Sequence, residues 1–477
     1  MSHPVTPAPA QTYSAPRRQM WFWGIGTIAD ALMIQTFALI MPIFNTGFGL
    51  DAVLLSWAIM IPRLVDGLID PFMGHLSDNI HTRWGRRKPF LVVTCILGAI
   101  VVAGIWWANP EWPKSWQFAY VVVFATLYYT TWGTFSMSHY ALGYELTDDY
   151  HERARVMAIR TVFLQFVVLA VSWTYWLALR PVFGGEINGI RWIGGAMGVL
   201  IIITGLVPVF ACKERFAQSN RKHPPILQSM KEAFRLPAFR TYIALRFFAA
   251  FGLVVFSQLI FYVNVYHVCA GDKSLATKIV GIGTMLTVGI SVAILPFVPR
   301  LSRWMGKRNA VIAGCAIALV QACIVPLLYN PAQPYLQLVA AALTAPLVAV
   351  AIVLRDAIVP DICDLDELEN GLRREGLFTA VVSFVYKLEV SLCVVLVGYM
   401  LKFSAFDPKV AVQGPEVLSR LQWFAFLPNI LFAALALVCA IRFPVTEAVM
   451  RDVRARLDAR RASAKETANA PVSAPAA

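Results

Sequence analysis

The chain has 477 residues, of which 58% are hydrophobic and only 14% are charged, and its formal net charge is +13. A mean hydropathy of +0.62 leaves too little polar surface for a water-soluble protein of this size. These values exclude an ordinary soluble enzyme or binding domain and predict a membrane protein.

Apolar windows long enough to cross a bilayer occur twelve times along the chain. Each has about 20 residues, which a helix needs to span roughly 30 Å of hydrocarbon. The windows are centred near residues 32, 63, 98, 128, 168, 201, 252, 287, 319, 347, 389 and 431. Runs of this length, separated by short polar loops, predict an all-α membrane protein with twelve transmembrane helices.

Lysine and arginine residues concentrate at the N-terminus, in every second loop and in the C-terminal tail. Membrane proteins keep such basic loops on the cytoplasmic side. Both termini are therefore predicted to be cytoplasmic, in a plasma membrane that in a bacterium is the inner membrane. Because the positive charge follows the topology, we expect the lipid bilayer as surroundings and no nucleic acid as a partner.

Sequence patterns typical of enzymes and metal centres are missing. The eight cysteines show no CxxC or Cys/His spacing, and no HExxH or GxSxG pattern occurs. We therefore expect no enzymatic activity, no disulfide, no cofactor and no metal centre apart from a coupling cation.

The first predicted span runs from about Met20 to Phe44 and contains one carboxylate, Asp30. A carboxylate inside an apolar run either hydrogen-bonds to a neighbouring helix or faces a polar cavity. We favour the cavity, because Arg18, the nearest basic residue on the cytoplasmic side, lies three helical turns away.

The second predicted span carries Arg63, Asp66 and Asp70, which share one helix face because they are three and four residues apart. A charge at the bilayer centre costs about 3 kcal/mol, so this face avoids lipid. One interpretation is a structural ion pair between Arg63 and Asp66. We favour a cation site at Asp66 and Asp70, because an ion pair needs one carboxylate and two neighbouring carboxylates bind Na⁺ or share a proton.

The fourth predicted span is rich in rings and hydroxyls between Trp132 and Tyr140, too deep for the interfacial aromatic belt. A face that mixes rings with hydroxyls suits a sugar, whose C–H faces stack on rings while its hydroxyls seek partners. The fifth span takes Arg160 into the membrane, where this side chain either reaches back to the cytoplasmic interface or enters the binding site.

The second half of the chain repeats the first. The segment from Arg83 to Arg87 returns 220 residues later between Arg303 and Arg308, and the same offset places Arg153 on Arg373. Two six-helix halves in parallel orientation are typical of a transporter that works by alternating access. The predicted organisation is a disordered tail, 1–19; a first half, 20–212; a cytoplasmic linker, 213–238; a second half, 239–443; and a basic, mostly disordered tail, 444–477.

Charged residues in the cytoplasmic loops are candidates for gating. Glu145 and Arg153 lie in the loop before span 5, and Asp361 and Arg373 lie in the loop before span 11. Ion pairs between these loops would hold one state closed, although a simply solvated loop is an equal alternative. In span 11, Lys387 is near mid-membrane and is expected to approach the acids of spans 1 and 2.

These residues resemble those of the glycoside-pentoside-hexuronide:cation symporters, which include melibiose permease and lie within the major facilitator superfamily. The pattern runs from Arg63, Asp66 and Asp70 through Pro71, Gly74, Ser77 and Asp78 to Arg83, Trp84, Gly85, Arg86, Arg87 and Pro89. Further matches begin at Ala141 and Asp361, and the resemblance covers all twelve spans.

The resemblance implies a major facilitator fold and cation-coupled symport of a sugar or glycoside. It implies that Asp66 and Asp70 bind the coupling H⁺ or Na⁺ and that Lys387 links the two sites. Asp30 and Arg160 would bind the solute, with Tyr140 in the place of the family's stacking ring. Trp132, from the ring-rich face of span 4, is a further candidate for solute contact. The remaining charged motif residues would serve gating or structure: Arg63, Asp78, Arg83, Arg86, Glu145, Arg153, Asp361 and Arg373.

One departure from the family pattern bears on the cation. Melibiose-type members have a further acid in span 4, where this chain has Ser136, His139 and Tyr140. Both H⁺ and Na⁺ therefore stay open, with the missing acid favouring H⁺. The alternative solute is a lysolipid, which animal relatives of the family carry. A monomer is expected, because the two halves already complete one interface.

Overall fold

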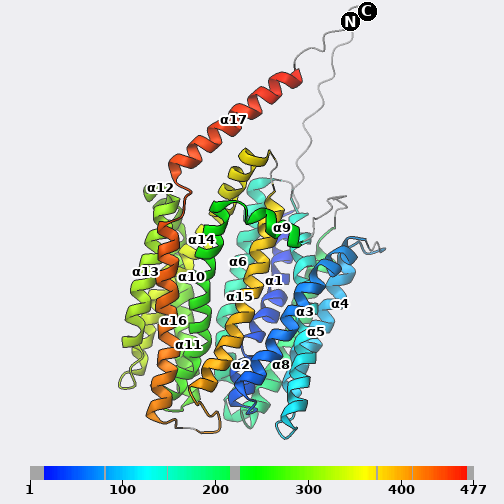
Figure 1. Cartoon of the computed structure of the whole chain (residues 1–477). Coiled ribbons are helices and arrows are strands. Elements are labelled where there is room, and N and C mark those ends of the chain that lie inside the picture. Colours follow the sequence, from blue (N-terminus) through cyan, green and yellow to red (C-terminus); the bar gives the residue numbers. More distant parts are fainter. Residues whose placement is uncertain are drawn as a thin grey trace, which may run out of the picture. The chain divides into compact units, whose positions relative to one another are not determined.

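The computed structural model describes residues 16–79, 82–147, 149–214, 226–371, 374–410 and 412–469. The described chain is almost entirely helical (Figure 1). The α-helices of the first part are α1 (Arg17–Phe37), α2 (Ile40–Thr46), α3 (Ala52–Asn79), α4 (Lys88–Gly104), α5 (Lys114–Tyr144), α6 (Tyr150–Ser172), α7 (Thr174–Ala178), α8 (Glu186–Ala211) and α9 (Ile226–Ala233). Those of the second part are α10 (Pro237–Tyr262), α11 (Lys273–Ile294), α12 (Val298–Met305), α13 (Lys307–Leu328), α14 (Gln337–Asn370), α15 (Glu375–Phe403), α16 (Pro415–Ile441) and α17 (Glu447–Asn469).

Short helical turns join several of these helices. They are the 3₁₀ turns Ile105–Trp107, Pro181–Phe183, Leu295–Phe297 and Pro334–Leu336 and the π-helical turn Val263–Val268.

The predicted spans coincide with long helices. Nine stretches of the described residues are long and apolar enough to cross a membrane by length and composition. The other three predicted spans fall on α3, α5 and α14, which have 28, 31 and 34 residues. α3 carries three charged residues within the predicted span, Arg63, Asp66 and Asp70. The prediction of a twelve-span all-α membrane protein is confirmed.

The first predicted span is broken into α1 and α2 at residues 38–39. Pro42 stands four residues after Ala38 and has no backbone N–H to donate to the carbonyl of that residue. The continuous helix expected from Met20 to Phe44 therefore ends at Phe37 and restarts at Ile40.

The chain divides into two compact units. The first comprises Met1–Asn220, Asp272–Thr284 and Leu401–Ala411, and the second comprises Arg221–Gly271, Met285–Met400 and Val412–Ala477. In the first unit α8 packs on α1 and α4, and α5 packs on α3. In the second unit α16 packs on α10 and α13. Glycines allow close approach between helices: a Cβ on Gly205 of α8 would lie 3.2 Å from the Ala29 Cβ of α1.

The C-terminal segment differs from the prediction of a mostly disordered tail, because α17 extends over 23 residues. Met450, Val453 and Leu457 are buried in the hydrophobic core cluster of the second unit, together with Ile362 of α14. Their spacing of three and four residues places them on one helix face, so burial against α14 holds the helix.

Candidate functional site

Asp30 is the centre of a polar site in the first unit. The residue is 4% exposed, which removes its carboxylate from water. Nε1 of Trp132 on α5 donates a hydrogen bond of 3.0 Å to Oδ1, and Nη2 of Arg160 on α6 lies 3.5 Å from Oδ2. Three helices thus contribute to one site, and both carboxylate oxygens have a donor.

Arg160 is held on a second side by Tyr140. The guanidinium carbon lies 4.3 Å from the centre of the Tyr140 ring, a close cation–π contact. Arg160 is therefore turned towards Asp30 and Tyr140. The four candidate solute residues of the first unit, Asp30, Trp132, Tyr140 and Arg160, come together in one place.

A reciprocal contact between α1 and α5 holds Asp30 in position. Nε1 of Trp23 donates to the His139 carbonyl at 2.8 Å, and Nε2 of His139 lies 3.0 Å from the Trp23 carbonyl. The two rings stack with centres 4.8 Å apart. Gly26 makes the approach possible, since a Cβ there would lie 2.8 Å from Nε2 of His139 and 2.5 Å from Cγ of Pro208.

His139 therefore packs α1 against α5. Sequence reasoning named His139 only as a neighbour of Tyr140, and it missed Trp23. The signal available in the sequence was the Gly24 and Gly26 pair in an apolar span, which indicates a close helix contact without naming the partner.

The candidate cation site lies on α3. Asp66 is 2% exposed, and Nη1 of Arg63 donates to the Tyr129 hydroxyl at 3.3 Å while the guanidinium carbon lies 5.1 Å from the Tyr129 ring centre. The Tyr128 ring centre lies 5.2 Å from that of Tyr129, which contacts Arg63, and 6.5 Å from that of Trp132, which contacts Asp30, so the two candidate sites are neighbours.

The helical backbone of α3 includes Asp70 and Asp78, but their side chains are outside the described part of the structure. The pairing of Asp66 with Asp70 therefore stays a prediction. Among the residues that are described, no group of three or more His, Cys, Asp or Glu side chains could hold a metal ion.

The charged motif after α3 binds to two acids of its own unit. Arg86 and Arg87 lie 3.6 and 3.1 Å from Oε1 of Glu145, and their backbone N–H groups both donate to Oε1 of Glu214 at 2.9 Å. Gly85 has φ +113°, and a Cβ there would collide with Glu214. Sequence reasoning missed Glu214, because it lies in the predicted linker.

The other two predicted gating residues of the first unit take simpler roles. Arg83 is exposed in the turn that Thr82 and Gly85 close, and Nε of Arg153 donates to the Thr147 carbonyl at 3.1 Å.

The second unit has a charge cluster of its own at Asp361. Oδ2 of Asp361 lies 2.6 Å from Nζ of Lys307, and Oδ1 lies 3.0 Å from Nη2 of Arg454 on α17. Nearby, Arg374 contacts Asp366 and Glu232, each at 2.6 Å, and the hydrogen bonds to Asp366 raise the pKa of its guanidinium.

Arg373 lies outside the described residues, so its predicted role is not observed. The ion pairs described at Glu145 and Asp361 each join residues of one unit, and pairing between the two loops stays a prediction. Lys387 belongs to the second unit, where Ser391 donates to its carbonyl at 2.8 Å.

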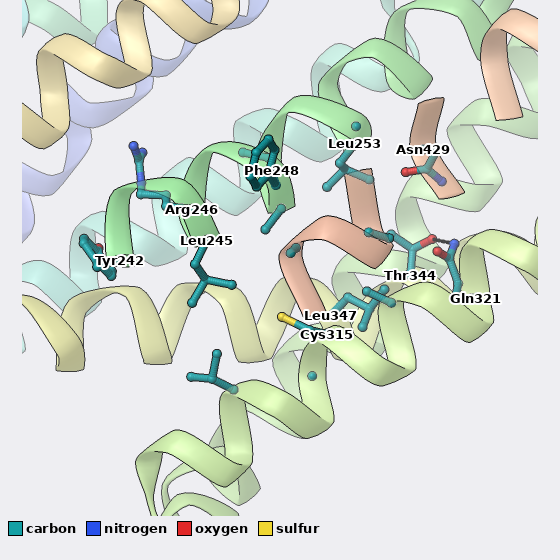
Figure 2. Close-up of a pocket in the computed structure, with 18 of the residues that line it drawn as sticks. Tyr242, Leu245, Arg246, Phe248, Leu253, Cys315, Gln321, Thr344, Leu347 and Asn429 are labelled. Carbon is teal, nitrogen blue, oxygen red and sulfur yellow. Dashed lines mark hydrogen bonds between the residues drawn. The ribbon is translucent and has the colours of Figure 1, made fainter. Parts of the chain in front are cut away.

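The second unit contains a cavity of about 620 Å³ between α10, α13, α14, α15 and α16 (Figure 2). Its wall is mostly apolar. Arg246 stands at one end, and at the other Nε2 of Gln321 donates to the Thr344 hydroxyl at 3.1 Å.

The family model of MFS/sugar transport proteins matches residues 22–447. The chain belongs to this family. It is similar to the putative glycoside/cation symporter YagG of Escherichia coli, at 24% identity over 93% of this chain and 95% of that protein. It is also similar to the isoprimeverose transporter of Lactiplantibacillus pentosus, at 23% identity over 83% and 82% of the two chains.

Solved major facilitator structures share the fold. The crystal structure of a D-xylose-proton symporter matches with a TM-score of 0.61 at 15% identity, over 89% of this chain and 97% of that one. The MFS/sugar transport family consists of membrane transporters, so the chain is a multi-pass transporter and no enzyme, and the predicted major facilitator fold is confirmed.

Proposed function

We propose that the chain is a proton-coupled symporter of a glycoside or other small sugar-like solute that works by alternating access. The observation that supports it most is the carboxylate of Asp30 held between Trp132 and Arg160. The similar proteins named as a glycoside/cation symporter and an isoprimeverose transporter support the solute class.

A sugar suits the chemistry of this site. Its hydroxyls donate to the Asp30 carboxylate and accept from the Arg160 guanidinium, and these charge-assisted hydrogen bonds are the strong ones. Its C–H faces stack on the rings of Trp132 and Tyr140. Lys387 is proposed as a further solute contact that links the solute site to the cation site.

The coupling cation is proposed to bind at Asp66 and Asp70 of α3. Na⁺ seeks several oxygen ligands, and where melibiose-type members have a further acid in span 4 this chain has Ser136, His139 and Tyr140. Nε2 of His139 lies at the Trp23 carbonyl. A proton needs only one carboxylate. Arg63 beside Asp66 moderates the negative charge when the proton leaves.

The protein is proposed to act as a monomer in a plasma membrane, the inner membrane in a bacterium, with both termini in the cytoplasm. The predicted gating role of the loops is proposed to rest on the clusters around Glu145 and Asp361. Each is an acid held by two bases and changes partners when a helix moves.

The test is solute uptake into proteoliposomes across a panel of glycosides, with an imposed H⁺ or Na⁺ gradient. Accumulation of one glycoside with the H⁺ gradient supports the proposal. Na⁺-stimulated uptake at fixed pH and membrane potential overturns proton coupling. Failure of every sugar, with binding of a lysolipid by the folded protein, overturns the solute class in favour of the alternative.

A further inference from the structure

A second buried carboxylate, Glu389, lies in α15 of the second unit. Its exposure is 0%, and in the described part of the chain neither of its carboxylate oxygens has a hydrogen-bond partner. Asp30 and Asp66 were predicted as functional acids, but Glu389 was not. An ionised carboxylate without a hydrogen-bond partner raises the free energy of the folded protein strongly in this place, because ionised groups lose their hydration on burial.

Contacts on both sides of Glu389 show that its helix face packs on α10. One turn before it, the Arg246 guanidinium of α10 lies 5.1 Å from the Tyr386 ring centre. One turn after it, Sγ of Cys393 lies 3.8 Å from the Phe251 carbonyl of α10. Because Tyr386, Glu389 and Cys393 are spaced by three and four residues, Glu389 lies on the same face between these contacts.

Arg246 is the charged residue of α10 that contacts this face of α15. Its Nη1 donates to the Val382 carbonyl at 3.3 Å, and its guanidinium stacks on Tyr386. The other titratable groups on this face of α15 are Tyr386 and Cys393, which are neutral at pH 7. On α10, Tyr242 lies one turn before Arg246 and is also neutral at pH 7.

The surroundings of Glu389 therefore allow two arrangements. In the first, a protonated Glu389 is neutral, and Arg246 keeps its contacts with Val382 and Tyr386. In the second, an ionised Glu389 pairs with Arg246, which compensates the buried charge. The contacts of Arg246 in the structure are those of the first arrangement.

We propose that Glu389 is a proton-binding site of the second unit, protonated in the arrangement described here and paired with Arg246 once the proton has left. On release, the carboxyl O–H bond breaks, the proton passes to water, and the carboxylate draws Arg246 from the Val382 carbonyl. Its role in a transport cycle rests on the proposed symport, whereas the proton site itself does not.

The movement of Arg246 is the structural consequence. Arg246 stands at one end of the cavity of the second unit, as Figure 2 shows, so a change in its partner changes the charge and shape of that cavity. The protonation of Glu389 is thereby linked to the packing of α10 on α15.

Difference infrared spectroscopy of the protein in liposomes tests the site without transport. A carbonyl band of a protonated carboxylic acid that appears on acidification and shifts in D₂O is expected in the wild type. The band is expected to be lost in Glu389→Gln and kept in Glu416→Gln, whose carboxylate is exposed. An unchanged set of bands in Glu389→Gln overturns the proposal.

Arg246→Gln gives a second variant in case Glu389→Gln does not fold. Without the positive charge of Arg246, the ionised form of Glu389 is less stable and the carboxyl keeps its proton. The band is therefore expected to persist in Arg246→Gln to a pH about 1 unit or more above that of the wild type. If the band disappears at the same pH in Arg246→Gln as in the wild type, the proposal is also overturned. The outcomes separate the two proposals. If the Glu389 band is observed but no glycoside is transported, only the symport proposal is refuted. If a glycoside is transported but the band is absent, only the proton site at Glu389 is refuted.

Discussion

Nη2 of Arg160 lies 3.5 Å from Oδ2 of Asp30, although the two residues are 130 positions apart in the chain. Both are partly or fully withdrawn from water, with side-chain exposures of 18% and 5%. A buried pair of this kind binds a polar solute well, because the free energy of removing the two groups from water is spent when the protein folds and not when the solute binds.

Replacement of Asp30 by Asn is expected to weaken solute binding. The amide loses the charge-assisted acceptor, and hydrogen bonds to charged groups contribute about 1.5–3 kcal/mol, or roughly tenfold to a hundredfold in affinity. Isothermal titration calorimetry with the transported glycoside measures the change. The matched control is Asp51→Asn, because Asp51 is exposed at the start of α3. Equal affinities for Asp30→Asn and the wild type would exclude Asp30 from the solute site.

Arg160→Lys is expected to weaken binding nearly as much as removal of the charge. Lysine keeps the positive charge but has neither the planar fork nor the flat face that stacks on Tyr140 at 4.3 Å. Binding of the same glycoside by Arg160→Lys and by Arg155→Lys, an exposed residue of α6, gives the comparison. Wild-type affinity in Arg160→Lys would show that charge alone suffices.

Gly26→Ala is expected to destabilise the first unit by roughly 1–3 kcal/mol, since the added methyl group collides with His139 and Pro208. The thermal unfolding midpoint in detergent reports the effect. Gly195→Ala on α8 is the control, because a Cβ there has no neighbour within 4 Å and alanine favours the helix. Equal midpoints for the two variants would contradict the packing described for α1 and α5.

Asp361→Asn is expected to loosen α17. The carboxylate holds Lys307 and Arg454, but these bases are 42% and 57% exposed, so solvent screening limits the loss to about 1 kcal/mol. Hydrogen exchange within 447–469 is expected to quicken about fivefold at that free energy. Glu447→Gln, whose pair with Arg451 is exposed, serves as control. Unchanged exchange in Asp361→Asn would show that apolar burial alone holds the helix.

The helices were predictable because each apolar window is a local property of the sequence. The break between α1 and α2 is marked in the sequence by Pro42, and the length of α17 by the spacing of Met450, Val453 and Leu457. The gathering of Asp30, Tyr140 and Arg160 was predictable through the family resemblance, and Trp132 was a candidate from the ring-rich face of the fourth span.

The contacts that position the site were not predictable from sequence. The stack of Trp23 on His139 joins residues 116 positions apart, and no local pattern names such a partner. In the sequence Glu214 is an acid of the predicted linker with nothing to distinguish it. Its role follows from the turn at Gly85, which places the backbone N–H groups of Arg86 and Arg87 at its carboxylate. Glu389 was visible beside Lys387, but its burial is a property of packing.

The most direct test of proton-coupled symport is the pH of a lightly buffered medium around de-energised proteoliposomes after the transported glycoside is added. The account predicts that the medium becomes alkaline with wild-type protein, because protons enter with the solute, and that Asp66→Asn abolishes this change while still binding the glycoside. Solute entry with no change in pH, or the wild-type pH change in Asp66→Asn, would contradict it.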